Sequence, residues 1–188
     1  MSVLSLSGKI GVGKTSVADF VTPKFAENIT VGRYGFGDLL KRECSQNFDF
    51  DLSLAYSQSG KNTIIKHPDL PKGQMSIREI LQWWGTDIRR EQNEDYWVLE
   101  MERFYSEFQG DLLIIDDVRF PNEADFGKNS GFLVRIHPYD GWIPGPYASH
   151  ESETALDNYR DWDLEIKPDF GKLEIASDFI FDLSKRFS

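Results

Sequence analysis

The ten residues SGKIGVGKTS, at positions 7–16, constrain this chain more than any other stretch. They fit the pattern G-x-x-x-x-G-K-S/T, with an apolar run at residues 3–6 before them and apolar residues at helical spacing after them. Glycines let successive backbone N–H groups turn towards one anion, and a helix starting there adds its positive N-terminal end. The pattern therefore predicts a strand, a phosphate-binding loop and a helix; an ordinary flexible glycine turn is the alternative.

The loop residues have separate predicted roles in holding a nucleotide. Lys14 can reach the terminal phosphates, and the Thr15 hydroxyl can ligate Mg²⁺. The role of Lys9 stays open between a phosphate contact and a position that faces solvent. The expected nucleotide-binding residues are Gly8, Gly11, Val12, Gly13, Lys14, Thr15 and Ser16.

A second buried strand is predicted within LLIIDDVRF, residues 112–120. Its four leading apolar residues fit a fully buried parallel strand, whose carboxyl end would face the same crevice as the loop. Asp116 and Asp117 alternate across the strand, so one of them is expected to face the site and to help hold a metal; alternatively the pair only begins a loop. Arg119 either neutralises phosphate charge or forms a surface salt bridge.

A helix is predicted over residues 76–90, where Ser76 and Glu79 fit a capping box. At about 100° per residue its apolar side chains gather into one arc. Side chains along the edge of this arc could grip a bound anion or only cover the core with their stems. The residues on that edge are Arg78, Gln82, Gly85 and Arg89.

The remaining pattern alternates strands and helices. Further helices are expected at residues 35–44, from Asp95 to about Gly110 and from Leu173 to Phe187, with another strand at 132–136. This order predicts one doubly wound α/β domain of the P-loop NTPase type over residues 1–188, with a mostly parallel sheet and helices on both faces. Segments of about 45–75 and 138–155 are expected to be mobile substrate and lid segments; a surface excursion is the alternative for the first.

Charge and cysteine content limit the partners. The net charge is −10, with +3 over residues 1–42 and −13 over the rest. This balance disfavours stable nucleic-acid binding or an anionic membrane surface, whereas a local basic site suits a compact anion. One cysteine, Cys44, cannot form an internal disulfide, and no stretch has the roughly 18 apolar residues of a membrane span. A cytoplasmic protein that does not bind membranes is therefore expected.

Among nucleotide-binding classes, a small kinase fits best. A GTPase would need N/T-K-x-D and D-x-x-G elements, and the sequence has neither. A kinase must hold two phosphate-bearing molecules and therefore needs several cations besides the loop lysine. The available ones are Arg33, Lys41, Arg42, Arg78, Arg89 and Arg119.

Several segments resemble the bacteriophage deoxynucleoside monophosphate kinases, within the P-loop nucleoside-monophosphate kinase group. They are SGKIGVGKTSVADF at 7–20, FGDLLK at 36–41, SIREILQWWGTD at 76–87, DYWV at 95–98, IIDDVRFPNEA at 114–124 and DFGKLEIASDF at 169–179. The combination of R-x-x-x-Q-x-x-G-T-D, D-Y-W-V and D-V-R is more selective than the loop, which many families share.

The resemblance implies transfer of a phosphoryl group from ATP, with Mg²⁺, to a deoxynucleoside monophosphate. It assigns catalytic roles to Lys14, Arg119, Asp117 and Asp38, and metal binding to Thr15 and Asp117. It places Lys41, Arg78 and Gln82 at the acceptor, and Arg42 and Arg89 from the cations above complete the expected substrate-binding residues. The setting would be the infected host cytosol if the chain comes from a phage.

The predicted mechanism is direct in-line transfer without a covalent enzyme intermediate. The alternatives are a P-loop kinase of another phosphorylated metabolite or of a modified base in DNA, and a nucleotide-binding module without turnover. Which bases are accepted, and whether the chain forms a homodimer, stay open.

Overall fold

The computed structural model describes residues 2–145 and 148–184, which fall into two compact units. Unit 1 comprises residues 1–35 and 107–188, and unit 2 comprises residues 36–106. Phe187, the expected end of the last helix, and residues 146–147 of the expected lid segment lie outside the described residues.

Unit 1 contains a five-stranded sheet in which every neighbouring pair of strands is parallel. The spatial order is β2-β5-β1-β6-β7. The strands are β1 (Ser2–Gly8), β2 (Val31–Arg33), β5 (Leu112–Val118), β6 (Gly131–Ile136) and β7 (Leu164–Ile166). The two predicted strand cores, at 3–6 and 112–115, are the central neighbours β1 and β5, because only continuous apolar segments tolerate burial on both faces.

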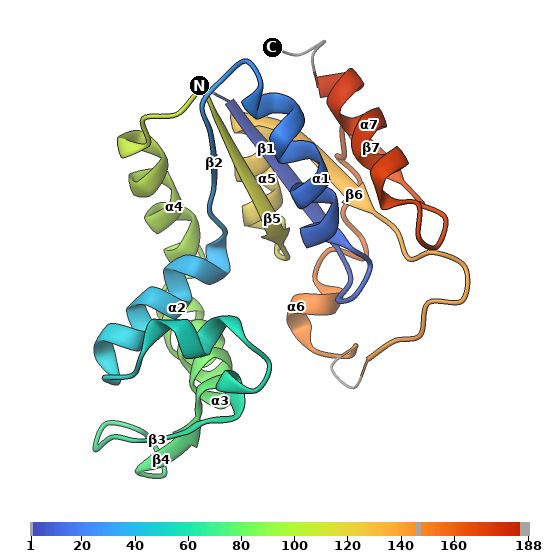
Figure 1. Ribbon diagram of the computed structural model, residues 1–188. Coiled ribbons are helices and arrows are strands. Elements are labelled where there is room, and N and C mark those ends of the chain that lie inside the picture. The colour runs from blue at the N-terminus through green and yellow to red at the C-terminus, as the bar shows by residue number, and fades with distance from the viewer. Residues whose placement is uncertain (1, 146–147, 185–188) are drawn as a thin grey trace. The chain divides into compact units, whose positions relative to one another are not determined.

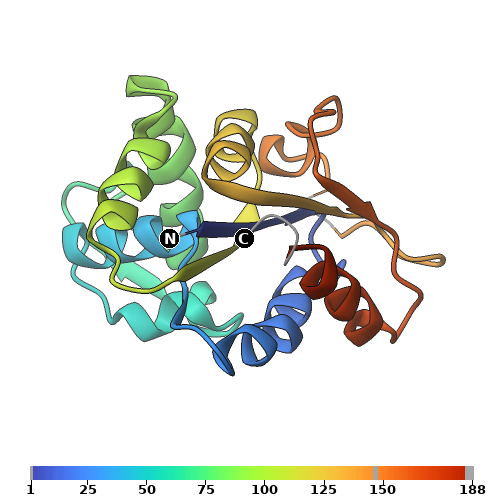
Figure 2. The same cartoon turned by 90° about the horizontal axis from the view of Figure 1, so that it is seen from above.

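Helices cover both faces of this sheet. Helices α1 (Lys14–Ala26) and α7 (Leu173–Ser184) lie together on one face, and α5 (Pro121–Ser130) lies on the other (Figure 2). A short helix, α6 (Glu151–Thr154), follows β6 in the chain (Figure 1). The predicted α/β fold class, with a parallel sheet between helical layers, is confirmed.

The core of unit 1 lies between β1, β5, β6 and the pair α1 and α7. Val17, Val21 and Phe25 on α1 are buried there, as their helical spacing predicts. Phe20, which was placed on the same apolar face, is 41% exposed instead.

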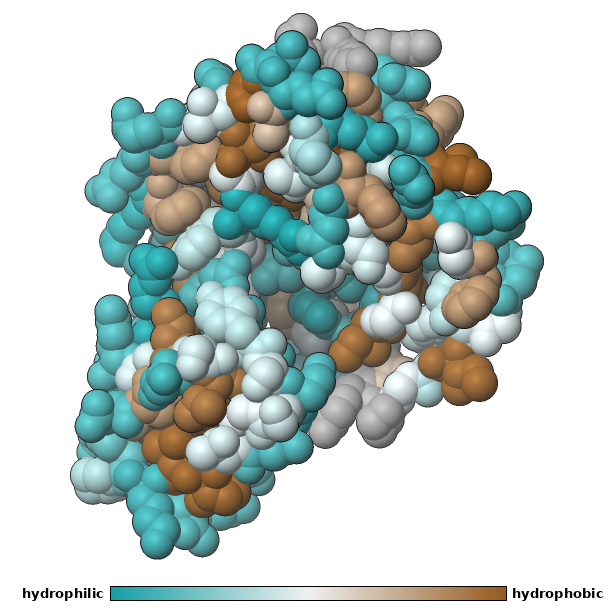
Figure 3. Space-filling model, viewed as in Figure 1, coloured by the Kyte–Doolittle hydropathy of each residue, from teal (hydrophilic) through white to brown (hydrophobic). Residues whose placement is uncertain are grey.

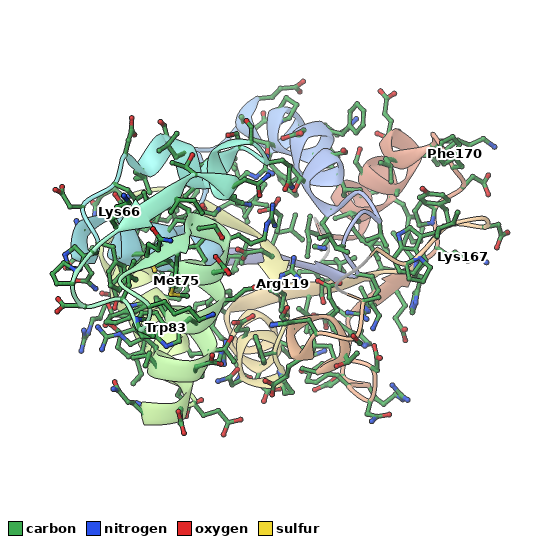
Figure 4. All side chains as sticks on the ribbon, turned by 90° about the horizontal axis from the view of Figure 1, so that it is seen from below. Lys66, Met75, Trp83, Arg119, Lys167 and Phe170 are labelled. Atoms are coloured by element: carbon green, nitrogen blue, oxygen red, sulfur yellow. The ribbon has the colours of Figure 1, made fainter. Side chains whose placement is uncertain are left out.

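Unit 2 is mainly helical. Its α-helices are α2 (Phe36–Asn47), α3 (Ile77–Gln82) and α4 (Tyr96–Glu107), and the last residue of α4 belongs to unit 1. It also contains the 3₁₀ helices η1 (Leu52–Tyr56) and η2 (Gly60–Asn62), the π-helix η3 (Trp83–Arg90), and the strands β3 (Ile64–Lys66) and β4 (Gln74–Ser76). Strands β3 and β4 form a two-stranded antiparallel sheet. Met75 and Trp83, both labelled in Figure 4, border a core that includes the buried Cys44. Burial raises the pKa of the Cys44 thiol, so it remains protonated.

The helix predicted over 76–90 begins as expected and then changes its winding. Ser76 Oγ accepts the Glu79 N–H at 3.3 Å, and Glu79 Oε2 accepts the Ser76 N–H at 2.7 Å, which completes the capping box. From Trp83 to Arg90 the chain is a π-helix. Its i→i+5 bonds widen the turn, so side chains after Gln82 leave the faces that α-helical spacing assigns to them.

In the described part of the chain, no helix combines the length and the apolar character that crossing a bilayer requires. The face drawn in Figure 3 carries many hydrophilic side chains with apolar patches between them.

Candidate active site

The loop between β1 and α1 has the backbone geometry that its glycines predict. Gly11 and Gly13 have φ of 79° and 95°, in the left-handed region that glycine tolerates best. At Gly13 a Cβ atom would also lie 2.6 Å from Leu173 Cδ1 of α7. Helix α1 begins one residue later, at Lys14, so the loop passes directly into a helix N-terminus. This is the arrangement that binds phosphate in other proteins with the motif.

Val12 and Ser16 contribute to this loop in different ways. The Val12 side chain is buried in the core of unit 1, so only its backbone can meet a nucleotide. Ser16 lies half-buried in the first turn of α1. Gly8 ends β1, where a Cβ atom would lie 2.6 Å from the Ile136 carbonyl oxygen on the neighbouring strand. The loop is therefore fixed to the sheet at its start and to the core at its centre.

Lys14 carries a buried ammonium group at the start of α1. The residue is 8% exposed, and Nζ donates to the carbonyl oxygens of Gly8 at 2.7 Å and Lys9 at 3.0 Å. Burial, and next the positive charge of Arg119, lower the pKa of Lys14 from 10.5 to about 8. Three carboxylates oppose this shift, those of Glu153, Asp117 and Asp116. The site therefore holds a positive charge at neutral pH at a cost in stability that an anionic ligand would offset.

Thr15 is bonded to Asp116 at the carboxyl end of β5. Thr15 Oγ1 donates to Asp116 Oδ2 at 2.9 Å, and the Asp116 side chain is 16% exposed. Arg33, at the end of β2, donates to the same Asp116 oxygen at 2.6 Å and also to Asp19 on α1. The sequence predicts Arg33 as an available cation but does not predict its pairing with Asp116.

Asp117, the aspartate that the family resemblance selects, points elsewhere. A Cβ atom on Gly35 would lie 2.5 Å from both Asp117 carboxylate oxygens, so that carboxylate packs against the Gly35 backbone. The two aspartates alternate across β5 as their positions require. The structure thus pairs the Thr15 hydroxyl with Asp116, while Asp117 acts on Lys14 through its charge.

Arg119 lies just beyond the end of β5 (Figure 4). Its backbone N–H donates to Glu123 Oε2 at 2.8 Å, and its guanidinium donates to Glu153 Oε1 on α6. Both glutamates are buried, at 3% and 6% exposed. The Arg119 guanidinium is therefore ion-paired with a buried carboxylate, and its positive charge acts on the Lys14 ammonium group.

The predicted acceptor residues on α2 lie in unit 2. Lys41 Nζ bonds to Asp38 Oδ1 at 2.9 Å, one helical turn apart, and lies 4.3 Å from the centre of the Tyr56 ring. Arg42 is exposed on the same helix. The pair of Asp38 and Lys41 is therefore formed within a single turn.

Arg78 and Gln82 lie one turn apart on α3, on the same side of the helix. The Arg78 guanidinium donates to Gln58 Oε1 at 2.7 Å, and Gln82 is exposed. These two residues keep the edge position that the sequence predicts, because both precede the π-helix.

Arg89 does not continue that edge. Its guanidinium bonds to Glu43 Oε1 at 2.5–2.6 Å and lies 4.7 Å from the ring centres of both Trp84 and Tyr96. The Arg89 side chain is 25% exposed. These contacts connect α2, the π-helix and α4 within unit 2.

Comparison with known proteins identifies two relatives. A scan of protein-family models finds no match. A protein of Acanthamoeba polyphaga mimivirus, provisionally named a deoxynucleotide monophosphate kinase, is 30% identical over 184 residues, which cover 88% of each chain. The deoxynucleoside-5'-monophosphate kinase of Escherichia phage T5 is 28% identical over 111 residues, 49% of this chain and 44% of that protein.

The chain belongs to the deoxynucleotide monophosphate kinase family. The family predicted from the sequence is therefore confirmed, and so is the prediction that the chain is a kinase. In this kinase, the loop, Thr15, Asp116 and Arg119 belong to unit 1, and the predicted acceptor residues lie in unit 2.

The lowered pKa of Lys14 predicts a pH-dependent stability difference between the wild-type kinase and a Lys14→Met variant. Because the folded-state pKa is about 8 and the ordinary value is 10.5, the wild type bears the full cost of the buried charge below pH 8. That cost disappears as pH rises towards 10.5, so the wild type should gain about 3 kcal/mol relative to the variant across this interval. Urea unfolding of both proteins at several pH values measures the difference. A difference that does not change with pH would contradict the lowered pKa.

Proposed function

We propose that this kinase transfers the γ-phosphoryl group of ATP to a deoxynucleoside 5'-monophosphate and releases the diphosphate. The observation that carries the proposal is the glycine loop with the buried Lys14 ammonium group beside the acidic end of β5, in a chain of this family. The names of the two relatives support a deoxynucleotide as acceptor.

The donor side of the reaction is assigned to unit 1. Backbone N–H groups of the loop, from Gly11 to Ser16, would hold the ATP phosphates. Lys14 is positioned by two carbonyl oxygens and would place its remaining N–H on the terminal phosphates. Arg119 would stabilise negative charge on the transferring group, since a guanidinium can donate two bonds to phosphate oxygens.

Thr15 and Asp116 fit the requirements of a magnesium site. A hydroxyl and a carboxylate, 2.9 Å apart, are the hard oxygen ligands that Mg²⁺ prefers, with one or two protein ligands completed by substrate phosphates. Mg²⁺, when bound, neutralises part of the phosphate charge. Arg33 orients the Asp116 carboxylate by its bond to the same oxygen. We therefore assign the metal to Thr15 and Asp116; Asp117, the aspartate of the family resemblance, is the alternative.

The acceptor side is assigned to unit 2. Arg78 and Gln82 on α3 would contact the monophosphate or its base, and Lys41, held by Asp38, would contribute a further positive charge. Arg89 is assigned to the structure of unit 2, since its guanidinium already bonds to Glu43 between two aromatic rings.

The proposed reaction predicts ADP formation that requires both Mg²⁺ and a deoxynucleoside monophosphate. The wild-type kinase should turn over with at least one of the four common deoxynucleoside monophosphates. A Lys14→Met variant should lose at least about a hundredfold of that rate because transition-state charge is left unneutralised. A coupled assay of ADP release against a panel of monophosphates measures this. Turnover with DNA alone, or tight ATP binding without any turnover, would contradict the proposal.

The metal assignment predicts different effects at the two neighbouring aspartates. Asp116→Asn should raise the Mg²⁺ concentration needed for half-maximal turnover about tenfold or more, because it weakens the carboxylate beside Thr15. Asp117→Asn should change this concentration much less. Magnesium titrations of the steady-state rate at saturating ATP separate the two variants. If only Asp117→Asn shifts the titration, the family-based assignment is correct and ours is wrong.

The acceptor assignment predicts that two arginines of unit 2 respond differently to truncation. Arg78→Ala should raise the KM for the monophosphate about tenfold while leaving the KM for ATP within about twofold, since it removes one charged contact. Arg89→Ala should instead lower the free energy of unfolding by about 1–3 kcal/mol, because Glu43 is left without its cation. Steady-state kinetics and urea unfolding of both variants test the distinction. An Arg78→Ala effect limited to ATP would refute the placement.

A further inference from the structure

We propose that Glu153 is a positioning residue for phosphoryl transfer, which fixes Arg119 and the tip of the phosphate-binding loop together from α6. The proposal rests on the proposed function, because it assigns Arg119 to the transferring phosphate. All of the residues involved belong to unit 1.

One carboxylate makes both connections. Glu153 Oε2 accepts the backbone N–H of Ile10 at 2.7 Å, and Glu153 Oε1 accepts the Arg119 guanidinium. The Glu153 side chain is 3% exposed. Ile10 precedes the amides from Gly11 to Ser16 that are assigned to the nucleotide. Glu153 can therefore hold the loop tip while those amides bind phosphate.

Arg119 is held at both of its ends. Glu123 accepts the backbone N–H groups of Arg119 and Phe120, at 2.8 and 3.2 Å, and Glu153 accepts the guanidinium. A long flexible side chain loses much rotamer entropy when it must adopt one geometry. The two glutamates fix Arg119 before substrate binds. The entropy of ordering its side chain is therefore lost on folding and does not add to the barrier of the reaction.

Lys9 makes a second connection between the loop and the segment that contains α6. Its Nζ donates to the backbone carbonyl oxygen of Glu153 and to Asp157 Oδ1. The same Asp157 oxygen lies 3.8 Å from an Arg135 nitrogen of β6, and Arg135 donates to Ser7 Oγ on β1 at 2.9 Å. Lys9 therefore contacts α6 and Asp157, an interaction that the sequence did not predict.

The segment after α6 is also attached to the sheet layer. Tyr159 Oη donates to Asp125 Oδ1 on α5 at 2.8 Å, and Trp162 lies with its ring centre 5.3 Å from the Arg135 guanidinium carbon. Glu153 therefore projects from a segment that is anchored on the C-terminal side of the loop contact. Such an anchored carboxylate can set the position of the groups that bond to it.

The use of a charged residue at this place argues for a role beyond packing. A buried carboxylate is costly unless it is paired, and an apolar side chain of similar volume often serves stability as well or better. Here the carboxylate is paired with the arginine that follows the acidic end of β5, beside the Lys14 ammonium group. Among the carboxylates that raise the pKa of Lys14 against the effect of burial, Glu153 has the largest effect.

The decisive experiment compares Glu153→Gln in two backgrounds. The substituted amide would still accept the Ile10 N–H but would lose the ion pair with Arg119. We expect kcat to fall about a hundredfold in the wild-type background, with the KM for ATP changed less than about threefold. In an Arg119→Met background the same substitution should lower kcat by less than about threefold, because Glu153 acts through Arg119. Glu151→Gln, on the exposed side of the same helix, is the matched control and should behave as wild type.

Equal losses in both backgrounds, or no loss of kcat, would overturn the proposal. A fall in kcat with the KM for ATP nearly unchanged is a result that a merely structural residue would not give, since loss of structure would change both. Hydrogen exchange of the Ile10 amide gives a readout without turnover: Glu153→Ala should speed it about tenfold or more, and Glu153→Gln much less. If the wild type transfers no phosphate but exchange follows this order, the proposed kinase reaction is wrong and the hydrogen bond between Glu153 and Ile10 is supported. Unchanged exchange in Glu153→Ala would show that this hydrogen bond does not hold the loop.

Discussion

The buried ammonium group of Lys14 is the interaction on which the arrangement of unit 1 depends. A positive charge that is 8% exposed requires acceptors on the protein, and the turn of the loop supplies the carbonyl oxygens of Gly8 and Lys9. Gly11 and Gly13 take the left-handed backbone that brings those carbonyls and the start of α1 to one point. The lowering of the Lys14 pKa to about 8 reflects the cost of burying this charge. An anion bound at the loop, as proposed for the nucleotide phosphates, would remove that cost.

Around this group, cations at the carboxyl edge of the sheet are paired with acids from other elements. Arg33 of β2 bonds to Asp116 of β5, Arg119 bonds to Glu153 of α6, and Lys9 bonds to Asp157. The pairs connect segments that are 34 to 148 residues apart in the chain. Such connections fix cationic groups before a ligand arrives, and preorganisation of this kind is how phosphoryl-transfer sites gain most of their rate.

The sequence predicts β1, the loop, α1 and β5 because a continuous apolar segment or a glycine motif can be recognised within a few neighbouring residues. Strands β2 and β7, of three residues each, were missed because so short a segment has no measurable periodicity. Arg89 was placed on the acceptor edge because α-helical spacing was assumed where the chain winds as a π-helix. Glu153 was predicted only as part of a mobile segment, since its contacts with Ile10 and Arg119 are 143 and 34 residues distant. Tertiary pairing of this kind leaves no local signal.

We propose that the buried lysine and its neighbours direct a phosphoryl group to an acceptor nucleotide and not to water. This is tested by incubating the kinase with Mg²⁺ and ATP radiolabelled at the γ-phosphate, with and without a deoxynucleoside monophosphate, and separating the products. Label should appear in the β-phosphate of a deoxynucleoside diphosphate, with little inorganic phosphate formed when the acceptor is absent. Release of labelled inorganic phosphate at the same rate with and without the acceptor would contradict it.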